Sequence, residues 1–514
     1  MRRKNIMSAK NKPFSLGSAP DIVDFAEVAF GYRKTEIPPK ALKLIESRRK
    51  ALEALLAEDR VMYGINTGFG ELASQRVSRE SLKSLQVNLI RSHACGVGDP
   101  LDDAEARGLI FARANELARG NSGVRPVVVK TLSALVNKGV IPFIPSKGSV
   151  GASGDLAPSA HMALTLIGEG MAKFEDERDW RPSAEVLKEA GIKPIELAEK
   201  EGLALINGTQ AMKAVGGLAL FEAMNLFYSS VLAGAMSVEA LKGTPSAFDK
   251  RIHELKPHPG QLEVAEMLES MLKGSQIRAS HKTADKRVQD PYCLRCMPQA
   301  MGAARDAIEY ALNVFETELG SVTDNPLVVE GKTRGSIDVI SGGNFHGQAV
   351  AFASDFAAIA LTALGNISER RTAQLVSDFE ILPPFLARNP GLESGFMIAH
   401  VTAAALCNEN KILSHPASAD SIPTSANKED FVSMGMNAAL KLRTVVRNVA
   451  CITAIELMAA AEGVEFHRPL KSGARVEAAL AQLRKISPAF KGDEVFSGRI
   501  EAVADAVLNG YFVP

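Results

Sequence analysis

The sequence predicts a mainly α-helical protein: an elongated central bundle of long helices joined to a mixed, loop-rich N-terminal region. Apolar, Ala-rich stretches with helical spacing cover about residues 203–241, 299–320, 346–364, 397–413 and 435–462. Strand-like alternation is scarce outside residues 335–340, and no repeat of solenoid period is visible. Because helices that are apolar on several sides need a covering surface, we expect the chain to form an oligomer.

The predicted N-terminal region, residues 1–200, alternates shorter helices with loops. Its first residues are basic and lack the apolar segment of a secretory signal. Helical patterns follow at residues 40–60, 80–95 and 103–138, the last of them broken near Gly120 and Gly123. A loop rich in glycine lies between the first two patterns, at residues 63–70.

The central bundle and the C-terminal helices are predicted to occupy residues 201–514. The first apolar stretch of this part, residues 203–241, is long enough to span a membrane. Lys213, Glu222 and Glu239 interrupt it, however, and glycines recur along it. We therefore expect a buried helix of a large bundle at this position.

Composition excludes several classes of partner and cofactor. The 514 residues include 59 Lys plus Arg and 59 Asp plus Glu, a balance that argues against nucleic acid or an anionic membrane as partner. Five cysteines are an odd, sparse set, which is typical of a reduced, cytoplasmic protein. Cys293 and Cys296 form a C-x-x-C pair, but no second pair follows at ligand spacing, so we expect no metal site.

Residues 148–158 form a turn rich in glycine and other small residues directly before a predicted helix. Gly148, Gly151 and Gly154 allow backbone conformations that a Cβ atom would forbid. Taken alone, such spacing indicates only a turn. Neither G-x-G-x-x-G nor a Gly-Lys-Ser/Thr phosphate loop is present, so we expect no nucleotide.

The run GSVGASGDLAPSAHMAL at residues 148–164 resembles the signature of the aromatic amino-acid ammonia-lyases, most closely of their histidine-specific members. The resemblance extends over about residues 40–470. It implies that Ala152, Ser153 and Gly154 cyclise: the Gly154 nitrogen attacks the Ala152 carbonyl, and Ser153 loses water to leave a methylidene group. The product, 4-methylidene-imidazol-5-one, is an electrophile that needs no metal, pyridoxal phosphate or nucleotide.

The same resemblance implies a bundle of the ammonia-lyase and fumarase–aspartase type. It also implies a homotetramer whose active sites are built from more than one subunit. The small side chain of Ala152, the hydroxyl of Ser153 and the unhindered nitrogen of Gly154 suit the chemistry of cyclisation.

Two N-terminal blocks match further site residues of the family. Tyr63, in YGINTGFGELAS, matches the base that removes the β-proton, although a tyrosine beside glycines is more often a packing residue. A phenol titrates near 10, so that role needs positive potential, which helix N-termini can supply. His93, in SHACGVG, matches a residue that contacts the substrate's imidazole ring, whereas a lone histidine is usually structural.

Two further blocks supply expected substrate contacts. Asn207, in LINGTQ, either caps the following helix or holds the carboxylate or amine side of the substrate. In VQDPYCLRC, Arg295 is assigned to the substrate carboxylate because its planar fork suits that group. Tyr292 and Gln289 are expected to line the electrophile. Cys293 departs from the family, where Ser is commoner.

The last block is DSIPTSANKEDF, at residues 420–431. Its Glu429 matches a residue that faces the substrate ring as a hydrogen-bond partner or auxiliary base, although acidic loop residues are normally solvated surface. Lys428 replaces a usual Gln and Phe431 a frequent His, which weakens the assignment of the substrate but not of the reaction. Phe345, in GNFH, is expected to form a wall of the pocket.

Together these matches imply non-oxidative elimination of ammonia from L-histidine to give trans-urocanate. The alternatives are the same elimination, or a 2,3-aminomutase shift, on tyrosine or phenylalanine. A third alternative is an inactive helical scaffold. The intact tripeptide, Tyr63 and Arg295 argue against that scaffold.

Overall fold

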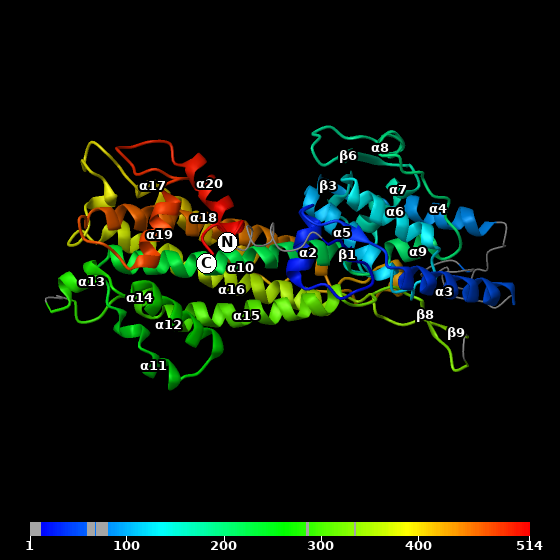
Figure 1. The fold of residues 1–514 in the computed structure, drawn as a ribbon, viewed down its shortest axis with the longest axis horizontal. Helices are drawn as coiled ribbons and strands as arrows, with labels where there is room; N and C mark the ends of the chain where they lie inside the picture. The colour runs from blue at the N-terminus through cyan, green and yellow to red at the C-terminus, as the bar shows by residue number, and fades with distance from the viewer. Residues whose placement is uncertain (1–11, 59–66, 68–80, 284–286, 334–335, 514) are drawn as a thin grey trace.

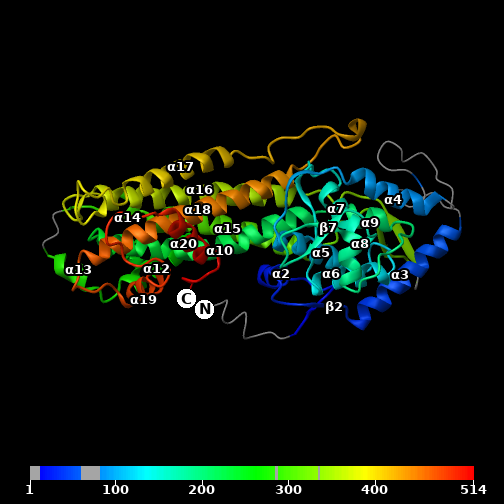
Figure 2. The same cartoon turned by 90° about the horizontal axis from the view of Figure 1, so that it is seen from above.

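The computed structural model describes residues 12–58, 67, 81–283, 287–333 and 336–513. Four long helices run along the longest axis of the molecule and form its centre (Figures 1 and 2). They are α10 (Gln210–Ala240), α15 (Met297–Leu319), α16 (Gln348–Ser377) and α18 (Gly435–Glu465). This elongated helical bundle confirms the predicted fold class.

Small residues let the long helices approach closely. A Cβ atom on Gly216 of α10 would lie 2.5 Å from the ring of Phe315 on α15. One ion pair is fully buried in the bundle, with 2.5 Å between Arg371 Nε and Glu456 Oε1. The remaining core is aliphatic and Ala-rich, so the bundle is held by close packing rather than by polar contacts.

Judged by length and composition alone, α10, α16 and α18 are apolar enough to cross a membrane. In the fold, 72%, 67% and 89% of their most apolar stretches are buried, in that order. Packing against other helices therefore covers most of this surface, as in the core of a large bundle. The prediction of a buried bundle helix in the 203–241 stretch is confirmed.

One apolar face of the bundle is not covered within the chain. Phe352, Phe356 and Ile359 follow each other at helical spacing on α16 and are 40%, 46% and 45% exposed. Ile398 and Val401 on α17 (Met397–Leu413) are also exposed, and Tyr310 of α15 lies 5.8 Å from the ring of Phe356. The face extends over three neighbouring helices.

Shorter helices and small sheets gather at the other end of the molecule (Figures 1 and 2). The helices are α2 (Ile22–Ala29), α3 (Pro39–Ala57), α4 (Leu82–His93), α5 (Asp103–Leu117), α6 (Pro126–Asn137), α7 (Ala157–Leu166), α8 (Ser183–Glu189) and α9 (Glu201–Ile206). The helices predicted at 40–60, 80–95 and 103–138 are present, the last divided as expected. The proposed boundary near residue 200 stays a prediction.

The strands are short, which explains why alternation did not reveal most of them. A parallel pair joins β1 (Phe14–Ser15) to β2 (Thr35–Glu36). The other sheets are antiparallel: β3 (Val97–Pro100) with β5 (Pro145–Lys147), β4 (Val140–Pro142) with β6 (Met171–Phe174) and β7 (Arg181–Pro182), and β8 (Leu327–Glu330) with β9 (Ile337–Ile340). Only β9 lies within the predicted alternation at residues 335–340.

The remaining helices cover the far end of the bundle. They are α11 (Lys250–Glu254), α12 (Pro259–Leu272), α13 (Gln276–His281), α14 (Tyr292–Arg295), α19 (Ala474–Leu483) and α20 (Ser497–Leu508), with short 3₁₀ turns at Pro245–Phe248 and Pro384–Leu386. A third 3₁₀ turn, Ser425–Asn427, lies at the opposite end, in the loop before α18. In both views α14 lies at the opposite end of the molecule from α7 and α9 (Figures 1 and 2).

The apolar stretch at 203–241 is not one continuous helix. It breaks between Ile206, where α9 ends, and Gln210, where α10 begins. Gly208, with φ +107°, has a backbone conformation that side-chain-bearing residues rarely adopt. The hydrophobic pattern did not reveal this break, because the residues directly before and after it are buried.

Candidate active site

An open pocket of about 880 Å³ lies at the end of the bundle where α10, α16 and α18 begin. It is lined by the end of α4, the glycine-rich turn, the break after α9, and the loops before α16 and α18. The pocket brings together six residues singled out from the sequence: His93, Ala152, Ser153, Asn207, Phe345 and Glu429. Gly154 directly follows Ala152 and Ser153 in the chain.

The tripeptide of residues 152–154 is strongly bent. Ser153 has φ +49° and Gly154 has φ +83°, so two successive residues occupy the left-handed region. A Cβ atom on Gly154 would lie 2.1 Å from the Gly208 carbonyl oxygen, which explains why only glycine fits there. The Gly208 N–H donates to the Ser153 carbonyl at 3.0 Å, and the Asp155 N–H donates to the Gly208 carbonyl at 2.8 Å.

Three helices begin next to this turn. The first, α7, starts at Ala157, three residues after Gly154. Asp155 is buried at the start of α10, where its carboxylate accepts hydrogen bonds from the Ala211 and Met212 N–H groups. At the start of α18, the Met434 N–H donates to the Val150 carbonyl at 2.9 Å. Helix N-termini carry partial positive charge, so these three helices contribute positive potential at the turn.

Glu429 lies directly beside the tripeptide. Its carboxylate accepts a hydrogen bond from the Ser153 hydroxyl at 3.3 Å and another from the Thr424 hydroxyl at 2.8 Å. The preceding turn holds three successive non-glycine residues in the left-handed region, Ser425 to Asn427, with φ +50°, +53° and +65°. Such strain is maintained where the surroundings over-determine the conformation, often at functional sites.

His93 lies at the C-terminal end of α4, on the same pocket. Burial lowers the pKa of its imidazole, and the Leu89 carbonyl and the Glu429 charge oppose this effect in part. The ring is therefore neutral at physiological pH, with one donor and one acceptor nitrogen. One of these nitrogens, Nδ1, lies 3.1 Å from the Ser92 hydroxyl.

Asn207 does not cap α10, as one of the two sequence-based hypotheses had it. The N-cap position is Thr209, and the Asp155 carboxylate binds the first N–H groups instead. The Asn207 side-chain amide donates to the Asn325 carbonyl at 2.7 Å. Its amide oxygen accepts no hydrogen bond from the part of the chain that the structure describes, and Asn207 lines the pocket.

Aromatic side chains form one border of the pocket. Phe345 is half-buried in its wall. His346 and Phe431 stack nearly in parallel, with 5.8 Å between ring centroids and 10° between planes, and His346 Nε2 lies 3.2 Å from the Phe431 carbonyl. Phe431 is 64% exposed, so this stacked pair borders the pocket towards solvent.

Gln289, Tyr292 and Arg295 do not line this pocket within one chain. The Thr244 N–H, just beyond the C-terminal end of α10, donates to Asp290 at 2.7 Å. The tripeptide lies instead at the first residue of α10. With 1.5 Å per residue, the 31 residues of α10 separate the two sites by about 45 Å. Within one chain Tyr292 and Gln289 therefore lie far from the tripeptide, and the expectation that they line the electrophile stays a prediction for a site shared between subunits.

The Tyr292–Arg295 helical turn presents an exposed aromatic ring beside a guanidinium. The Arg295 guanidinium lies 4.5 Å from the centre of the Tyr292 ring, in a cation–π contact. Tyr292 is 70% exposed, and Arg295 makes no ion pair with any residue that the structure describes. Tyr63, the expected base, lies outside the described residues.

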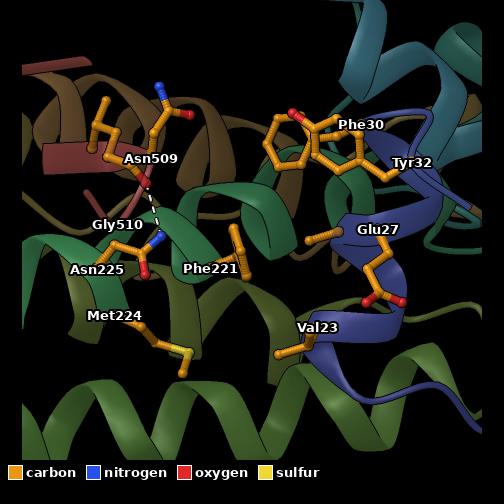
Figure 3. A pocket seen from close by; sticks show the side chains of 11 residues that line it. Val23, Glu27, Phe30, Tyr32, Phe221, Met224, Asn225, Asn509 and Gly510 are labelled. Atoms are coloured by element: carbon orange, nitrogen blue, oxygen red, sulfur yellow. Dashed lines mark hydrogen bonds between the residues drawn. The ribbon is translucent and has the colours of Figure 1, made fainter. Parts of the chain in front are cut away.

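A second, smaller cavity shares no lining residue with this pocket. It has about 40 Å³ and is lined by α2, α10 and the segment after α20, including Val23, Phe221, Met224 and Asn509 (Figure 3). The one carboxylate on it, Glu27, is paired with Arg33 at 3.1 Å. Across the described residues, no group of three His, Cys, Asp or Glu side chains is placed to hold a metal ion.

Comparison with known proteins identifies the family. The sequence profile described as "Aromatic amino acid lyase" matches residues 21–485. The chain is 50% identical to histidine ammonia-lyase of Sorangium cellulosum over 97% of this chain and 98% of that protein. The chain belongs to the aromatic amino acid lyase family.

Solved structures of this family of lyases have the same fold. Histidine ammonia-lyase from Trypanosoma cruzi superposes with a TM-score of 0.90 at 40% identity, covering 98% of this chain and 94% of that one. Tyrosine aminomutase from Streptomyces globisporus superposes with a TM-score of 0.91 at 36% identity, covering 98% of both chains. One fold therefore carries both reactions within the group of relatives.

Sequence reasoning missed Asp155 in this aromatic amino acid lyase. Burial raises the pKa of its carboxyl from 3.8 to about 7, while the Ala211 and Met212 N–H groups oppose the change. The signal was present: an aspartate directly follows the glycine-rich turn and precedes a helix by two residues. Because it binds the start of a different helix, α10, no local pattern revealed its role.

We expect Asp155→Asn to flatten the dependence of stability on pH. The raised folded-state pKa means that the unfolded chain ionises first, so wild-type stability falls as pH rises from 3.8 to about 7. Between pH 5 and pH 8 this loss amounts to about 2–3 kcal/mol per chain, and the amide variant lacks it. Urea denaturation at both pH values measures the difference. Parallel pH profiles would mean that Asp155 is already ionised at pH 5.

Proposed function

We propose that this protein eliminates ammonia from L-histidine to give trans-urocanate. The observation that carries the proposal is the convergence of the Ala-Ser-Gly tripeptide, His93 and Glu429 on one pocket. These residues come from three distant parts of the sequence and line the same pocket. Relatives named histidine ammonia-lyase, about half identical over nearly the whole chain, support the same substrate.

The prosthetic group proposed is 4-methylidene-imidazol-5-one formed from Ala152, Ser153 and Gly154. The bent backbone, the glycine that accepts no Cβ atom, and the pocket-facing position of Ser153 suit its formation. Once formed, the group supplies an electrophilic carbon that makes the substrate's amino group a better leaving group. The partial positive charge of three helix N-termini favours negative charge that develops nearby.

The protein's own side chains position the substrate. His93 offers a ring nitrogen that can donate or accept a hydrogen bond, and Glu429 offers a carboxylate. Together they match the two nitrogens of an imidazole ring. The amide oxygen of Asn207 is an acceptor that the described residues leave without a donor, so we assign it to the substrate's amino group. Phe345 packs against the ring from the pocket wall.

Two residues are candidates for removal of the β-proton. Tyr63 matches the family's base, and the positive potential of the helix N-termini would lower the pKa of a phenol placed there. Glu429 lies in the pocket beside Ser153 and is the auxiliary candidate. We assign the proton transfer to Tyr63 and ring binding to Glu429.

The complete site requires more than one subunit. Because Tyr292 and Arg295 lie about 45 Å from the tripeptide along α10, we propose that they enter the pocket of a neighbouring chain. The apolar face with Phe352, Phe356 and Ile359 is suited to pack against other subunits. We propose a homotetramer, in which Arg295 binds the substrate carboxylate of a neighbouring site.

We place the enzyme in the cytoplasm. All five cysteines are free thiols in the structure, and Cys293 and Cys451 are buried. Free thiols of this kind persist in a reducing compartment. The proposed substrate and product are small, water-soluble metabolites.

Substrate preference tests the proposed function. We expect the highest kcat/KM for histidine, a distant second for tyrosine, and almost no turnover of phenylalanine. A phenyl ring leaves His93 and Glu429 without partners, at about 1–3 kcal/mol each, whereas tyrosine can satisfy one of them. Initial rates with the three amino acids, followed as urocanate, coumarate and cinnamate, measure this order.

His93→Leu is the matched variant for substrate choice. It should lower kcat/KM for histidine strongly, since leucine removes one of the two partners of the imidazole ring. The ratio of kcat/KM for histidine to that for tyrosine or phenylalanine should therefore fall. Production of β-amino acids would reveal an aminomutase instead. Coumarate or cinnamate formed faster than urocanate would end the histidine assignment and leave the elimination chemistry in place.

Arg295→Lys tests the carboxylate site. Lysine keeps the charge but cannot form the paired hydrogen bonds of a guanidinium, so activity should fall although the charge is preserved. The lost contact is worth about 1.5–3 kcal/mol, which corresponds to about 10- to 150-fold in kcat/KM. Steady-state kinetics with histidine measure this loss. Wild-type values would move the carboxylate site elsewhere.

A further inference from the structure

The Asn207–Gly208 segment connects the tripeptide with a buried polar network. On one side, Gly208 exchanges backbone hydrogen bonds with Ser153 and Asp155, at 3.0 and 2.8 Å. On the other side, a Cβ atom on Gly208 would lie 2.5 Å from the Thr323 hydroxyl. The conformation of the tripeptide therefore depends on what holds this segment in place.

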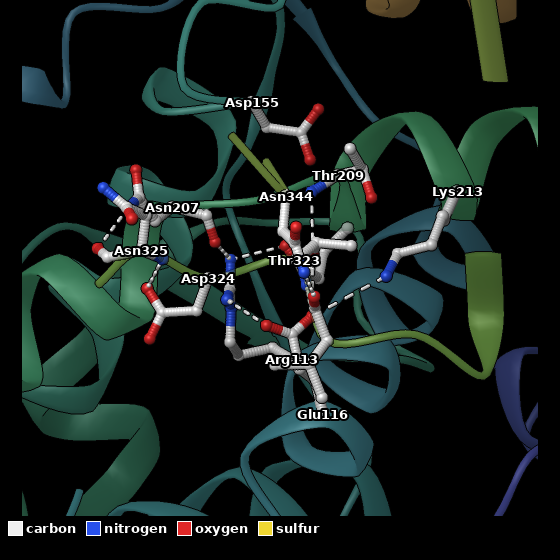
Figure 4. A network of polar contacts seen from close by, with 12 residues as sticks. Arg113, Glu116, Asp155, Asn207, Thr209, Lys213, Thr323, Asp324, Asn325 and Asn344 are labelled. Atoms are coloured by element: carbon white, nitrogen blue, oxygen red, sulfur yellow. Dashed lines mark hydrogen bonds and ion pairs between the residues drawn. The ribbon is translucent and has the colours of Figure 1, made fainter. Parts of the chain in front are cut away.

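Arg113 of α5 is one of the residues that hold it, together with Asn325, whose carbonyl accepts from the Asn207 side-chain amide. The side chain is fully buried, and in Figure 4 its guanidinium lies between Asn207 and Glu116. One nitrogen, Nη2, donates both to the Asn207 carbonyl and to Gln210 Oε1, the latter at 2.5 Å. One of these hydrogen bonds is directed to the segment that touches the tripeptide, and the other to the first residue of α10.

The remaining network sets the position of Arg113. Glu116 Oε1 lies 3.7 Å from Arg113 Nη1, and Glu116 Oε2 accepts from Thr323 at 2.8 Å. Lys213 lies 3.8 Å from Glu116, and a second buried pair joins Lys200 to Asp324 at 2.5 Å. With Asp155, the network comprises three buried basic side chains, Arg113, Lys200 and Lys213, and three buried carboxyl groups. Figure 4 shows Arg113, Lys213 and the three carboxyl groups.

Such a network is costly for folding alone. Burying a guanidinium costs free energy unless all its donors are paired. Here Arg113 Nε and Nη1 have no hydrogen-bond partner among the described residues. Hydrophobic side chains would fill the same space at lower cost, so the backbone contact of Arg113 accounts for its presence better than stability does.

We propose that Arg113 is a positioning residue for formation of the prosthetic group. By fixing the Asn207 carbonyl it sets the Gly208 peptide, and Gly208 holds Ser153 and Gly154 in the bent conformation. The inference rests on the proposed methylidene-imidazolone. Arg113 itself contacts neither the substrate nor the reacting atoms and acts through Asn207 and Gly208.

The reaction that Arg113 assists is a double dehydration. The Gly154 nitrogen bonds to the Ala152 carbonyl carbon, and that carbonyl oxygen leaves as water with the Gly154 and Ser153 amide protons. The Ser153 hydroxyl then leaves as a second water with the Ser153 Cα proton. No oxidant or co-reactant is needed, so the alignment of the backbone controls the first step.

Two matched variants test the proposal, Arg113→Lys and Arg371→Lys. Both arginines are fully buried beside a glutamate, but Arg371 is the 24th residue of α16, roughly 35 Å from its start near the pocket. Intact mass of the folded fraction, followed in time after a pulse of synthesis, gives the rate of dehydration. Arg113→Lys should slow it at least about tenfold, whereas Arg371→Lys should match the wild type.

A charge-balanced variant separates positioning from stability. Arg113→Met/Glu116→Gln removes one positive and one negative charge, so it keeps the net charge of the buried network, and circular dichroism and gel filtration would show whether it folds. Its dehydration should still be about 100-fold slower than in the wild type. Dehydration at the wild-type rate in either folded Arg113 variant would overturn the proposal. A wild-type chain without any mass deficit would overturn both this inference and the proposed prosthetic group.

Discussion

Ser153→Ala is expected to abolish the prosthetic group and to lower activity at least about 1,000-fold, with the fold intact. Without the Ser153 hydroxyl, no methylidene group can form. Wild-type protein should be two waters lighter than its encoded mass, and the variant should lack this full deficit. Alanine adopts φ near +49° with the same strain as serine, so stability should change little.

Ser149→Ala is the matched control for this experiment. Ser149 is a buried hydroxyl four residues earlier in the same turn, where it accepts a hydrogen bond from the Gly151 N–H at 3.2 Å. This variant should keep the mass deficit and most of the activity, because its hydroxyl takes no part in dehydration. Full activity in Ser153→Ala would end the proposal of a serine-derived electrophile.

Two inactive variants should restore each other's activity when they are co-expressed. Ser153→Ala removes the proposed electrophile of one pocket, and Arg295→Ala removes the carboxylate contact that, in the proposed tetramer, a neighbouring chain contributes to it. In random tetramers, a site is intact when its tripeptide comes from the Arg295 variant and its arginine from the Ser153 variant. This arrangement gives about one site in four, hence about a quarter of wild-type activity at equal expression.

Ser153→Ala with Glu429→Gln is the matched pair that should not complement. Both residues belong to the same pocket of one chain, 3.3 Å apart, so every mixed tetramer lacks one of them at each site. Separable affinity tags isolate the mixed tetramers for the assay. Recovery in both pairs, or in neither, would contradict the proposed sharing of sites between subunits.

Helix positions were predictable because their cause is local. The apolar face of a helix gives a repeat of 3.6 residues in the sequence, whichever element it packs against. The segments around 299–320, 397–413 and 435–462 are therefore helices, as expected. The break at Gly208 was not predictable in the same way. It depends on contact with Gly154, 54 residues earlier in the chain, and neither flank changes in hydrophobicity there.

In the candidate site, too, the features that depend on local sequence were predictable, and those that depend on tertiary contacts were not. By itself, the sequence determined the helical class, the tripeptide and the residue types that match the family's chemistry, since these are properties of short segments. Only the tertiary structure decided that His93, Asn207 and Glu429 share a pocket and that Tyr292 and Arg295 lie at the other end of α10. It also revealed Asp155 and Arg113 as buried supports of the turn. The physical reason is that burial and hydrogen-bond partners arise between segments far apart in the chain, which no local pattern of residues encodes.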